Sequence, residues 1–102
     1  MMPKGYVIIQ MKLDKPKLME QNATKIREIR DKYGGKRLVA RGGKIVYTEN
    51  TQEEYHPVVM EFPNVNAANN FFHDPEHQKI VKDLKTNNFG DGTVVIVEGV
   101  DE

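Results

Sequence analysis

The chain alternates between short runs in which most residues are apolar and longer stretches with helical spacing. Residues 6–11 and 93–98 are such runs, which are typical of strands covered on both faces. Residues 16–33 and 64–84 place apolar side chains three and four positions apart, as on one side of a helix. The first of these helices is expected to bury a stripe made by Leu18, Ala23, Ile26, Ile29 and Tyr33.

Residues that favour helix ends stand at the borders of both stretches. Asp14 offers a capping oxygen before Pro16, and Gly34 occupies the position of a left-handed helix end. Asn64 can cap the second helix, and Asp74, which a proline follows, can cap a fresh helical start inside it. The pattern therefore predicts an interruption in the second helical stretch.

The middle of the chain predicts a hairpin. Residues 36–40 have strand character, and residues 45–48 continue it after Gly42-Gly43. A glycine pair inside a strand is typical of a bulge, a bend or a closely approached backbone. We expect one of the two glycines to hold a conformation that other residues avoid. A polar turn follows, and residues 55–62 form the returning strand.

These elements follow the order β-α-β-β-α-β, which defines a split β-α-β arrangement. We predict an α+β, ferredoxin-like sandwich in which helices cover one face of a four-stranded antiparallel sheet. The strands at residues 7–9 and 94–97 present apolar side chains to both faces, so the uncovered face needs a partner. A two-fold homodimer that pairs two sheets, a dimeric α+β barrel, meets this need. The alternative is a monomer with an exposed apolar face.

Composition narrows the class of protein. The 102 residues predict a single domain, residues 1–102. Lys and Arg number 15, as do Asp and Glu, so no net charge attracts nucleic acid or an anionic membrane. The chain has neither cysteine nor serine, which excludes disulfides, thiolate sites and serine hydrolase chemistry. The first apolar run is too short for a signal or membrane helix, so we expect a cytoplasmic protein.

Five segments together carry a resemblance to a known family. They are Tyr33-Gly34-Gly35, Leu38-Val39-Ala40-Arg41-Gly42-Gly43, Val58-Val59-Met60-Glu61-Phe62-Pro63, Asp74-Pro75-Glu76 and Val95-Ile96-Val97-Glu98-Gly99. With these segments, residues 5–100 resemble the domain of unknown function 1330 family of the dimeric α+β barrel superfamily. That superfamily includes cofactor-free quinone-forming monooxygenases, muconolactone-type isomerases and haem enzymes, whereas the family itself has no settled activity.

The resemblance implies two candidate functions. The first is a cofactor-independent enzyme, isomerase-like or monooxygenase-like, that performs proton or enolate chemistry on a small organic molecule. The second is a non-catalytic dimeric module that binds a small ligand or a partner protein. The family usually has a tyrosine at the position of His77, an aromatic residue such as tryptophan near Phe71 and an arginine near Lys85. A pocket formed by these residues is therefore expected to have its own chemistry here.

Three residues are candidates for catalysis. The imidazole of His77 can exchange a proton near neutral pH, or it can simply pack under the second helix. Arg41, at the glycine bend, can hold a carboxylate or an enolate, or it can pair with Glu61 or Glu98. Glu61 lies among apolar neighbours and can act as a general base, or it can face outward beside a cation. If the protein is an enzyme, we expect its site where the Arg41 bend approaches the helix break between His73 and His77.

No metal or cofactor is expected. His73 and His77 are four residues apart, but the break at Asp74-Pro75 prevents one continuous helix from carrying both as ligands. We assign His73 instead to a helix end, where it can satisfy a free carbonyl. No nucleotide-binding glycine motif occurs in the sequence. The expected partners are a second copy of the chain and a small organic ligand, with an anionic one as the candidate.

Overall fold

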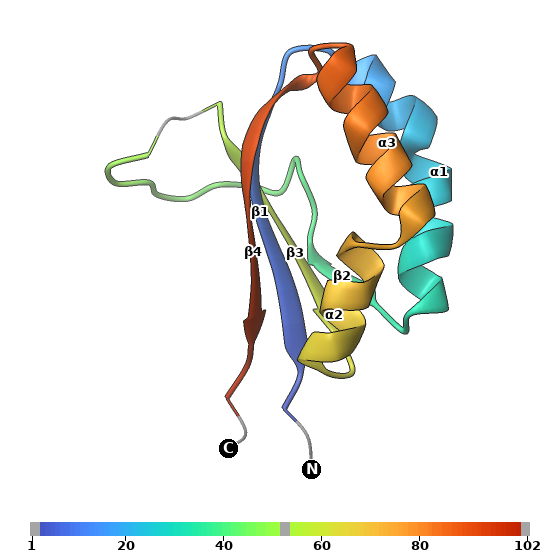
Figure 1. Cartoon of the computed structure of the whole chain (residues 1–102). Helices are drawn as coiled ribbons and strands as arrows, with labels where there is room; N and C mark the ends of the chain where they lie inside the picture. The colour runs from blue at the N-terminus through green and yellow to red at the C-terminus, as the bar shows by residue number, and fades with distance from the viewer. Residues whose placement is uncertain (1–2, 52–53, 101–102) are drawn as a thin grey trace.

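The elements of the protein follow the predicted order. The computed structural model describes residues 3–51 and 54–100. Its elements are β1 (Gly5–Leu13), α1 (Pro16–Lys32), β2 (Lys36–Val39), β3 (His56–Phe62), α2 (Val65–Phe72), α3 (Pro75–Thr86) and β4 (Gly90–Glu98). The strands form one antiparallel sheet in the order β2-β3-β1-β4, and the helices lie on one of its faces (Figure 1). The ferredoxin-like α+β fold is therefore confirmed.

Local capping explains where the helices begin and end. The side chain of Asn64 accepts a hydrogen bond from the backbone N–H of Ala67 at 2.8 Å, and Asp74 accepts one from Glu76 at 2.9 Å. Both caps were predicted, as was Gly34, which ends α1 with a φ of 75°. The predicted cap at Asp14 is wrong, because α1 has no side-chain cap.

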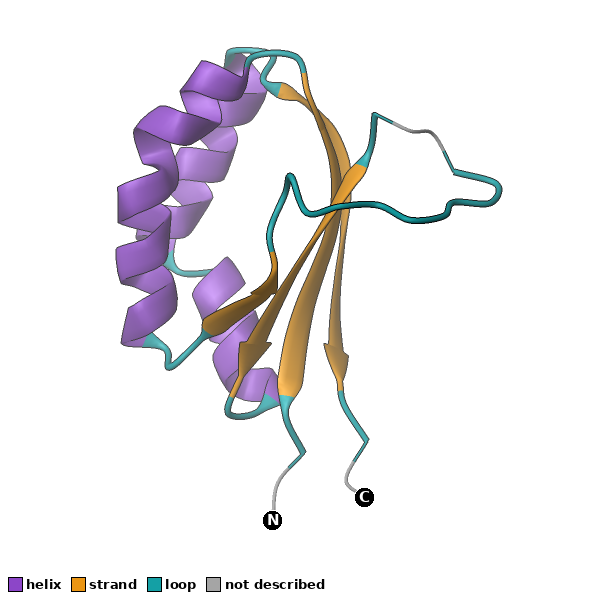
Figure 2. Cartoon of the chain, turned by 180° about the vertical axis from the view of Figure 1, so that it is seen from behind, coloured by secondary structure: helices purple, strands orange, loops and turns teal. Residues whose placement is uncertain are grey.

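Residues 45–48 do not form the strand that the sequence predicted. The chain leaves β2 after Val39 and runs away from the sheet on the side opposite the helices (Figure 2). We call residues 40–51 the arm. Gly42, with a φ of 100°, lies in a turn at its start, and Val46 farther along is 86% exposed. The β propensity of these residues is not realised, because no strand in the described part of the chain pairs with them.

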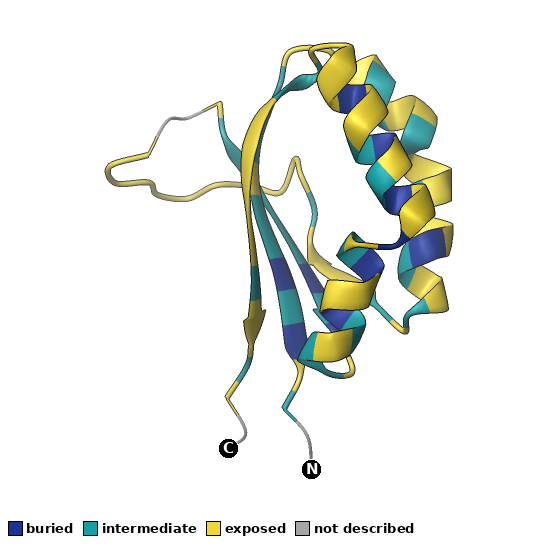
Figure 3. Ribbon diagram, in the orientation of Figure 1, coloured by how far each residue is buried: buried dark blue, intermediate teal, exposed yellow. Residues whose placement is uncertain are grey.

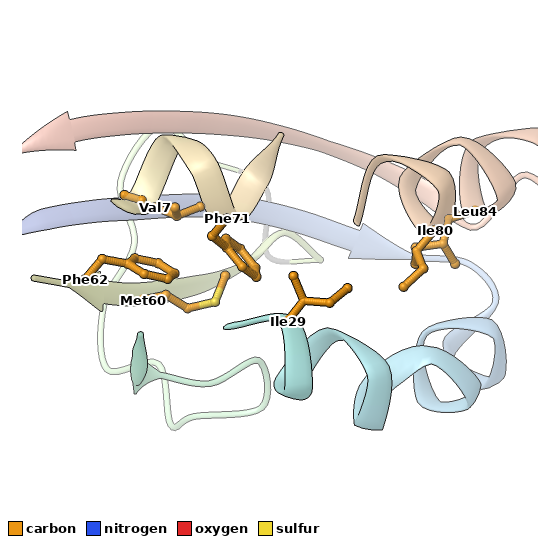
Figure 4. Packing of buried hydrophobic residues seen from close by; sticks show 8 residues of the cluster. Val7, Ile29, Met60, Phe62, Phe71, Ile80 and Leu84 are labelled. Atoms are coloured by element: carbon orange, nitrogen blue, oxygen red, sulfur yellow. The ribbon is translucent and has the colours of Figure 1, made fainter. Parts of the chain in front are cut away.

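The core lies between the sheet and the helices. Its apolar side chains come from β1, β3 and all three helices (Figure 4). The buried residues are Val7, Ile29, Met60, Phe62, Ala68, Phe71, Ile80 and Leu84. The rings of Phe62 and Phe71 lie 5.1 Å apart and join α2 to β3. Ala23 of the predicted stripe is exposed, so that part of the prediction is wrong.

The opposite face of the sheet is apolar and open. Strand alternation directs Ile8, Val59 and Val95 to this face, because each has a chain neighbour that faces the helices. Val95 and Val97 of β4 remain 54% and 41% exposed. Most of β4 has the colour of exposed residues in Figure 3. The prediction that the strands carry apolar residues on both faces is confirmed. No helix in the described ranges is long and apolar enough to cross a membrane.

Candidate functional site

A cavity of about 520 Å³ lies between the sheet and the helices α1 and α3. This volume is in the range of small-molecule sites. The wall is mostly apolar: the sheet contributes Ile9, Val58 and Met60, and the helices contribute Ile26 and Leu84. Such a wall can bury the apolar part of a ligand.

His77 is the titratable residue buried in this wall. It belongs to the first turns of α3, and only 6% of its surface is exposed. Its ring lies 4.6 Å from the ring of Phe71 and 5.1 Å from that of Phe72. The Nδ1 atom lies 2.8 Å from the carbonyl oxygen of Phe72. A carbonyl only accepts hydrogen bonds, so Nδ1 carries the proton and Nε2 keeps its lone pair.

The surroundings of His77 favour its neutral form. Burial lowers the pKa of the imidazole below its ordinary value, and the charge of nearby His73 lowers it further. The bond to the Phe72 carbonyl and the carboxylate of Asp74 act in the opposite direction, but burial is the largest influence. At neutral pH the ring is therefore an uncharged base with one free nitrogen.

Asp74 holds the start of the helix that carries His77. Its buried carboxylate accepts hydrogen bonds from the hydroxyl of Tyr33 at 2.6 Å and from the ammonium of Lys32 at 3.3 Å. The hydrogen bond from Tyr33 is the main cause that lowers the pKa of Asp74 to about 2, and the bond from the backbone N–H of Glu76 also lowers it. The carboxylate thus fixes the end of α1 to the beginning of α3, three residues before His77.

The structure brings together two of the three candidate residues. Arg41 and His77 both line the cavity. Glu61 does not, because it alternates with the buried residues Met60 and Phe62 and so faces the open side of the sheet. There its carboxylate accepts a hydrogen bond from the hydroxyl of Tyr6 at 3.1 Å and lies 3.5 Å from the ammonium of Lys36. Of the two roles considered for Glu61 from the sequence, the structure therefore agrees with the residue that faces outward beside a cation, and not with the general base.

Arg37 is a further residue of the cavity that was not among the predicted candidates. It pairs in register with Met60, on the face of the sheet that the helices cover, and it lines the cavity. The register shifts between Arg37 and Val39, so simple alternation along this segment does not reveal which side chains face inward. Arg27 and Arg30 of α1 also line the cavity. Their spacing of three residues is a signal in the sequence that could have placed both on one side of the helix.

His73 occupies a helix end, as expected. Its Nδ1 atom lies 3.0 Å from the carbonyl oxygen of Asn69, and the residue follows directly after α2. Across residues 3–51 and 54–100, no three His, Cys, Asp or Glu side chains gather in a way that could hold a metal ion. The chemistry that the cavity wall offers comes from an imidazole base and several guanidinium groups.

The family model described as Domain of unknown function (DUF1330) matches residues 4–100, and the chain belongs to this family. The resemblance drawn from the sequence is thereby confirmed. No curated protein matches the chain in sequence.

Solved structures share the fold at low sequence identity. A protein of unknown function from Rhodopseudomonas palustris is 14% identical with a TM-score of 0.69, and the match covers 100% of this chain and 86% of that one. SnoaB, a cofactor-independent oxygenase from Streptomyces nogalater, is 7% identical with a TM-score of 0.64, covering 98% and 96%. A dimeric protein of unknown function with a ferredoxin-like fold from Bacteroides fragilis is 16% identical with a TM-score of 0.59, covering 94% and 96%.

Proposed function

We propose that the protein is a cofactor-independent enzyme that moves a proton on a small, enolisable organic molecule bound in the cavity. The observation that carries this proposal is the state of His77. Its ring is buried in an apolar wall, one nitrogen is fixed by the Phe72 carbonyl, and the other keeps a lone pair. A neutral, oriented imidazole of this kind is suited to general base catalysis.

The proposed step uses only groups of this chain and its substrate. Nε2 of His77 takes a proton from the carbon next to a substrate carbonyl, and the C–H electron pair moves to the carbonyl oxygen. The resulting enolate oxygen carries a negative charge, which the guanidinium of Arg41 stabilises from the same cavity. Return of the proton from His77 to another position of the enolate gives an isomer, so atoms and electrons balance without a further reactant.

The comparisons support this class of chemistry by analogy of fold alone. SnoaB is described as a cofactor-independent oxygenase and shares the ferredoxin-like arrangement of this chain. Formation of an enolate is compatible with an isomerase-like outcome, and no bound cofactor is needed for the proton transfer itself. The carboxylate of Glu61, on the other face of the sheet, has no part in the proposed step.

We also propose that the protein is a homodimer and that the open face of the sheet forms the interface. Ile8, Val59, Val95 and Val97 give this face an apolar surface, and two-fold pairing would remove it from water on both protomers. The ferredoxin-like protein from Bacteroides fragilis is described as dimeric, which supports self-association for this fold.

Deuterium exchange tests the enzymatic proposal. Phenylpyruvate is a suitable probe, since its benzylic protons exchange through the enol and proton magnetic resonance follows them in heavy water. We expect the wild-type protein to accelerate exchange above the buffer rate and His77→Gln to lose that gain. Loss of a general base typically costs about 10²–10⁴-fold in rate. His73→Gln is the matched control, because His73 is exposed and lies outside the cavity wall.

The outcomes separate the two candidate functions. Equal exchange rates with wild-type protein, His77→Gln and buffer would contradict catalysis by this residue. If phenylpyruvate still saturates the protein under those conditions, as measured by calorimetry, the non-catalytic binding module is the better description. Arg41→Gln should slow exchange more than it weakens binding, because enolate charge develops only during the reaction.

A further inference from the structure

The charges around the cavity are unevenly distributed. Among the residues that the structure describes, five cationic side chains line it, from α1, β2, the arm and α3, against one acidic residue, Asp91. The cationic residues are Arg27, Arg30, Arg37, Arg41 and Lys85. The whole chain has a formal net charge of zero, so this excess is a local property of the cavity. A concentration of like charge beside apolar surface is unfavourable unless an anion offsets it.

Most of these cations have no acidic partner within residues 3–51 and 54–100. Arg30 donates to Asp31 at 3.0 Å, and Asp91 accepts from the hydroxyl of Tyr55. Neither Arg37 nor Arg41 takes part in an ion pair or side-chain hydrogen bond in the part of the chain that the structure describes. Their guanidinium groups therefore remain available to an external anion.

Arg37 has the position best suited to hold that anion. It projects from the sheet on the same side as the buried residue Met60, with which it pairs in register. Its neighbour Lys36 projects to the other face and pairs with Glu61 at 3.5 Å. Arg37 is exposed at the rim of the cavity, where its guanidinium can bind a carboxylate through two parallel hydrogen bonds.

We propose that the cavity selects organic carboxylates with an apolar body, and that Arg37 is the residue that determines this selectivity. The carboxylate lies at the arginine-lined edge, while the apolar body extends along Ile9, Met60 and Ile26 toward His77. This inference rests on the proposed function for the choice of site and adds the class of substrate. A ligand with one negative charge fits this cavity better than a multiply charged one, because most of the cavity wall is apolar.

Calorimetric titration of a matched ligand pair tests the proposal on the wild-type protein. The pair is 3-phenylpropanoate and 3-phenylpropanamide, which share their body and differ in charge. We expect the acid to bind at least about tenfold more tightly, as one charge-assisted bidentate contact allows. In the series butanoate, hexanoate, octanoate, the Kd should fall about fourfold per methylene group until the cavity is filled.

Substitutions at two neighbouring positions separate the contribution of Arg37 from a general effect of charge. Arg37→Gln and Lys36→Gln remove the same charge from opposite faces of one strand. The first should reduce the acid-to-amide ratio by about tenfold, whereas the second should keep it within about twofold. The wild-type comparison needs no variant, so it remains decisive if a substitution impairs folding.

Several results would overturn this inference. They are equal binding of acid and amide, no binding of either, inorganic phosphate binding as tightly as the acids, and an unchanged ratio in Arg37→Gln. Preferential binding of the acid without any deuterium exchange of phenylpyruvate would contradict the proposed enzyme but leave the carboxylate site intact. His77→Gln should retain the preference for the acid, because it changes the base and not the anion contact.

Discussion

Replacing Val95 by lysine tests whether the open face of the sheet is an interface. Val95 lies in the middle of β4 and pairs with Ile8 of β1 on this face. In the isolated chain its side chain is 54% exposed, so a lysine there can reach water without disturbing the core. We therefore expect Val95→Lys to fold normally and to act on association.

The size of the effect follows from the surface that remains exposed. Complete burial of a valine side chain contributes about 1.5–3 kcal/mol, and roughly half of that is still available to Val95 in the monomer. A two-fold axis counts the residue twice, so the substitution removes roughly 1.5–3 kcal/mol from dimer formation. This corresponds to a Kd weakened about 10- to 150-fold. Desolvation of two ammonium groups adds to that loss.

Sedimentation velocity over a concentration series measures the effect directly. Thr24→Lys is the matched control, since it adds the same charge at an exposed position of α1 on the helical side. The control should sediment as the wild type does, whereas Val95→Lys should be monomeric at micromolar concentration with an unchanged circular dichroism spectrum. A wild-type monomer, or a Val95→Lys dimer of wild-type affinity, would refute the assignment of the interface to this face.

Three further predictions concern stability. Gly42→Ala should cost on the order of 1–3 kcal/mol in urea unfolding, because φ at Gly42 is 100°, whereas Gly43→Ala, without a positive φ, should cost little. Tyr33→Phe should raise the pKa of Asp74 above about 2. The ionised Asp74 carboxylate stabilises the fold fully above pH 3.8, and the variant should lose this stabilisation at a higher pH than the wild type does on acidification. Circular dichroism can follow the acid unfolding, and an unchanged acid midpoint would contradict this prediction. Burial lowers the pKa of His77, so the unfolded chain binds more protons below pH 6.5 and stability falls as the pH drops through that value. His77→Gln should flatten this slope in urea titrations at several pH values, and a slope equal to that of the wild type would show that the ring is not the cause.

The sequence predicted the fold well because its elements are marked by local chemistry. Asn64 and Asp74 cap their helices through their own side chains, and Gly34 ends α1 with a positive φ. Each of these effects depends on residues within a few positions, which the sequence displays directly. Asp14 failed as a cap because its surroundings are set by a distant segment: its backbone N–H donates to the carbonyl of Phe89.

The candidate site was predictable only in part, since it depends on which face of a strand each side chain takes. Glu61 interrupts an otherwise apolar stretch at residues 58–62, and this pattern does not indicate which face of the sheet its side chain takes. The pairing with β1 then assigned it to the open face beside Tyr6. Arg41 was identified by its glycine neighbours and His77 by its titratable ring, and both line the cavity. Neither property indicates a distance between them, which only tertiary packing determines.

The segment whose structure the sequence predicted least well also supplies the cavity with two of its cationic residues, Arg37 and Arg41. Between Arg37 and Val39 the register shifts, and after Gly42 the predicted strand becomes the arm. A regular strand would have paired throughout with β3 and kept a fixed alternation of side chains. The irregularity instead leaves the guanidinium groups of Arg37 and Arg41, which have no ion pair among the described residues, at the wall of an apolar cavity. Departures from local pattern that lack a structural benefit are expected at functional sites, and this is the physical reason to test Arg37 first.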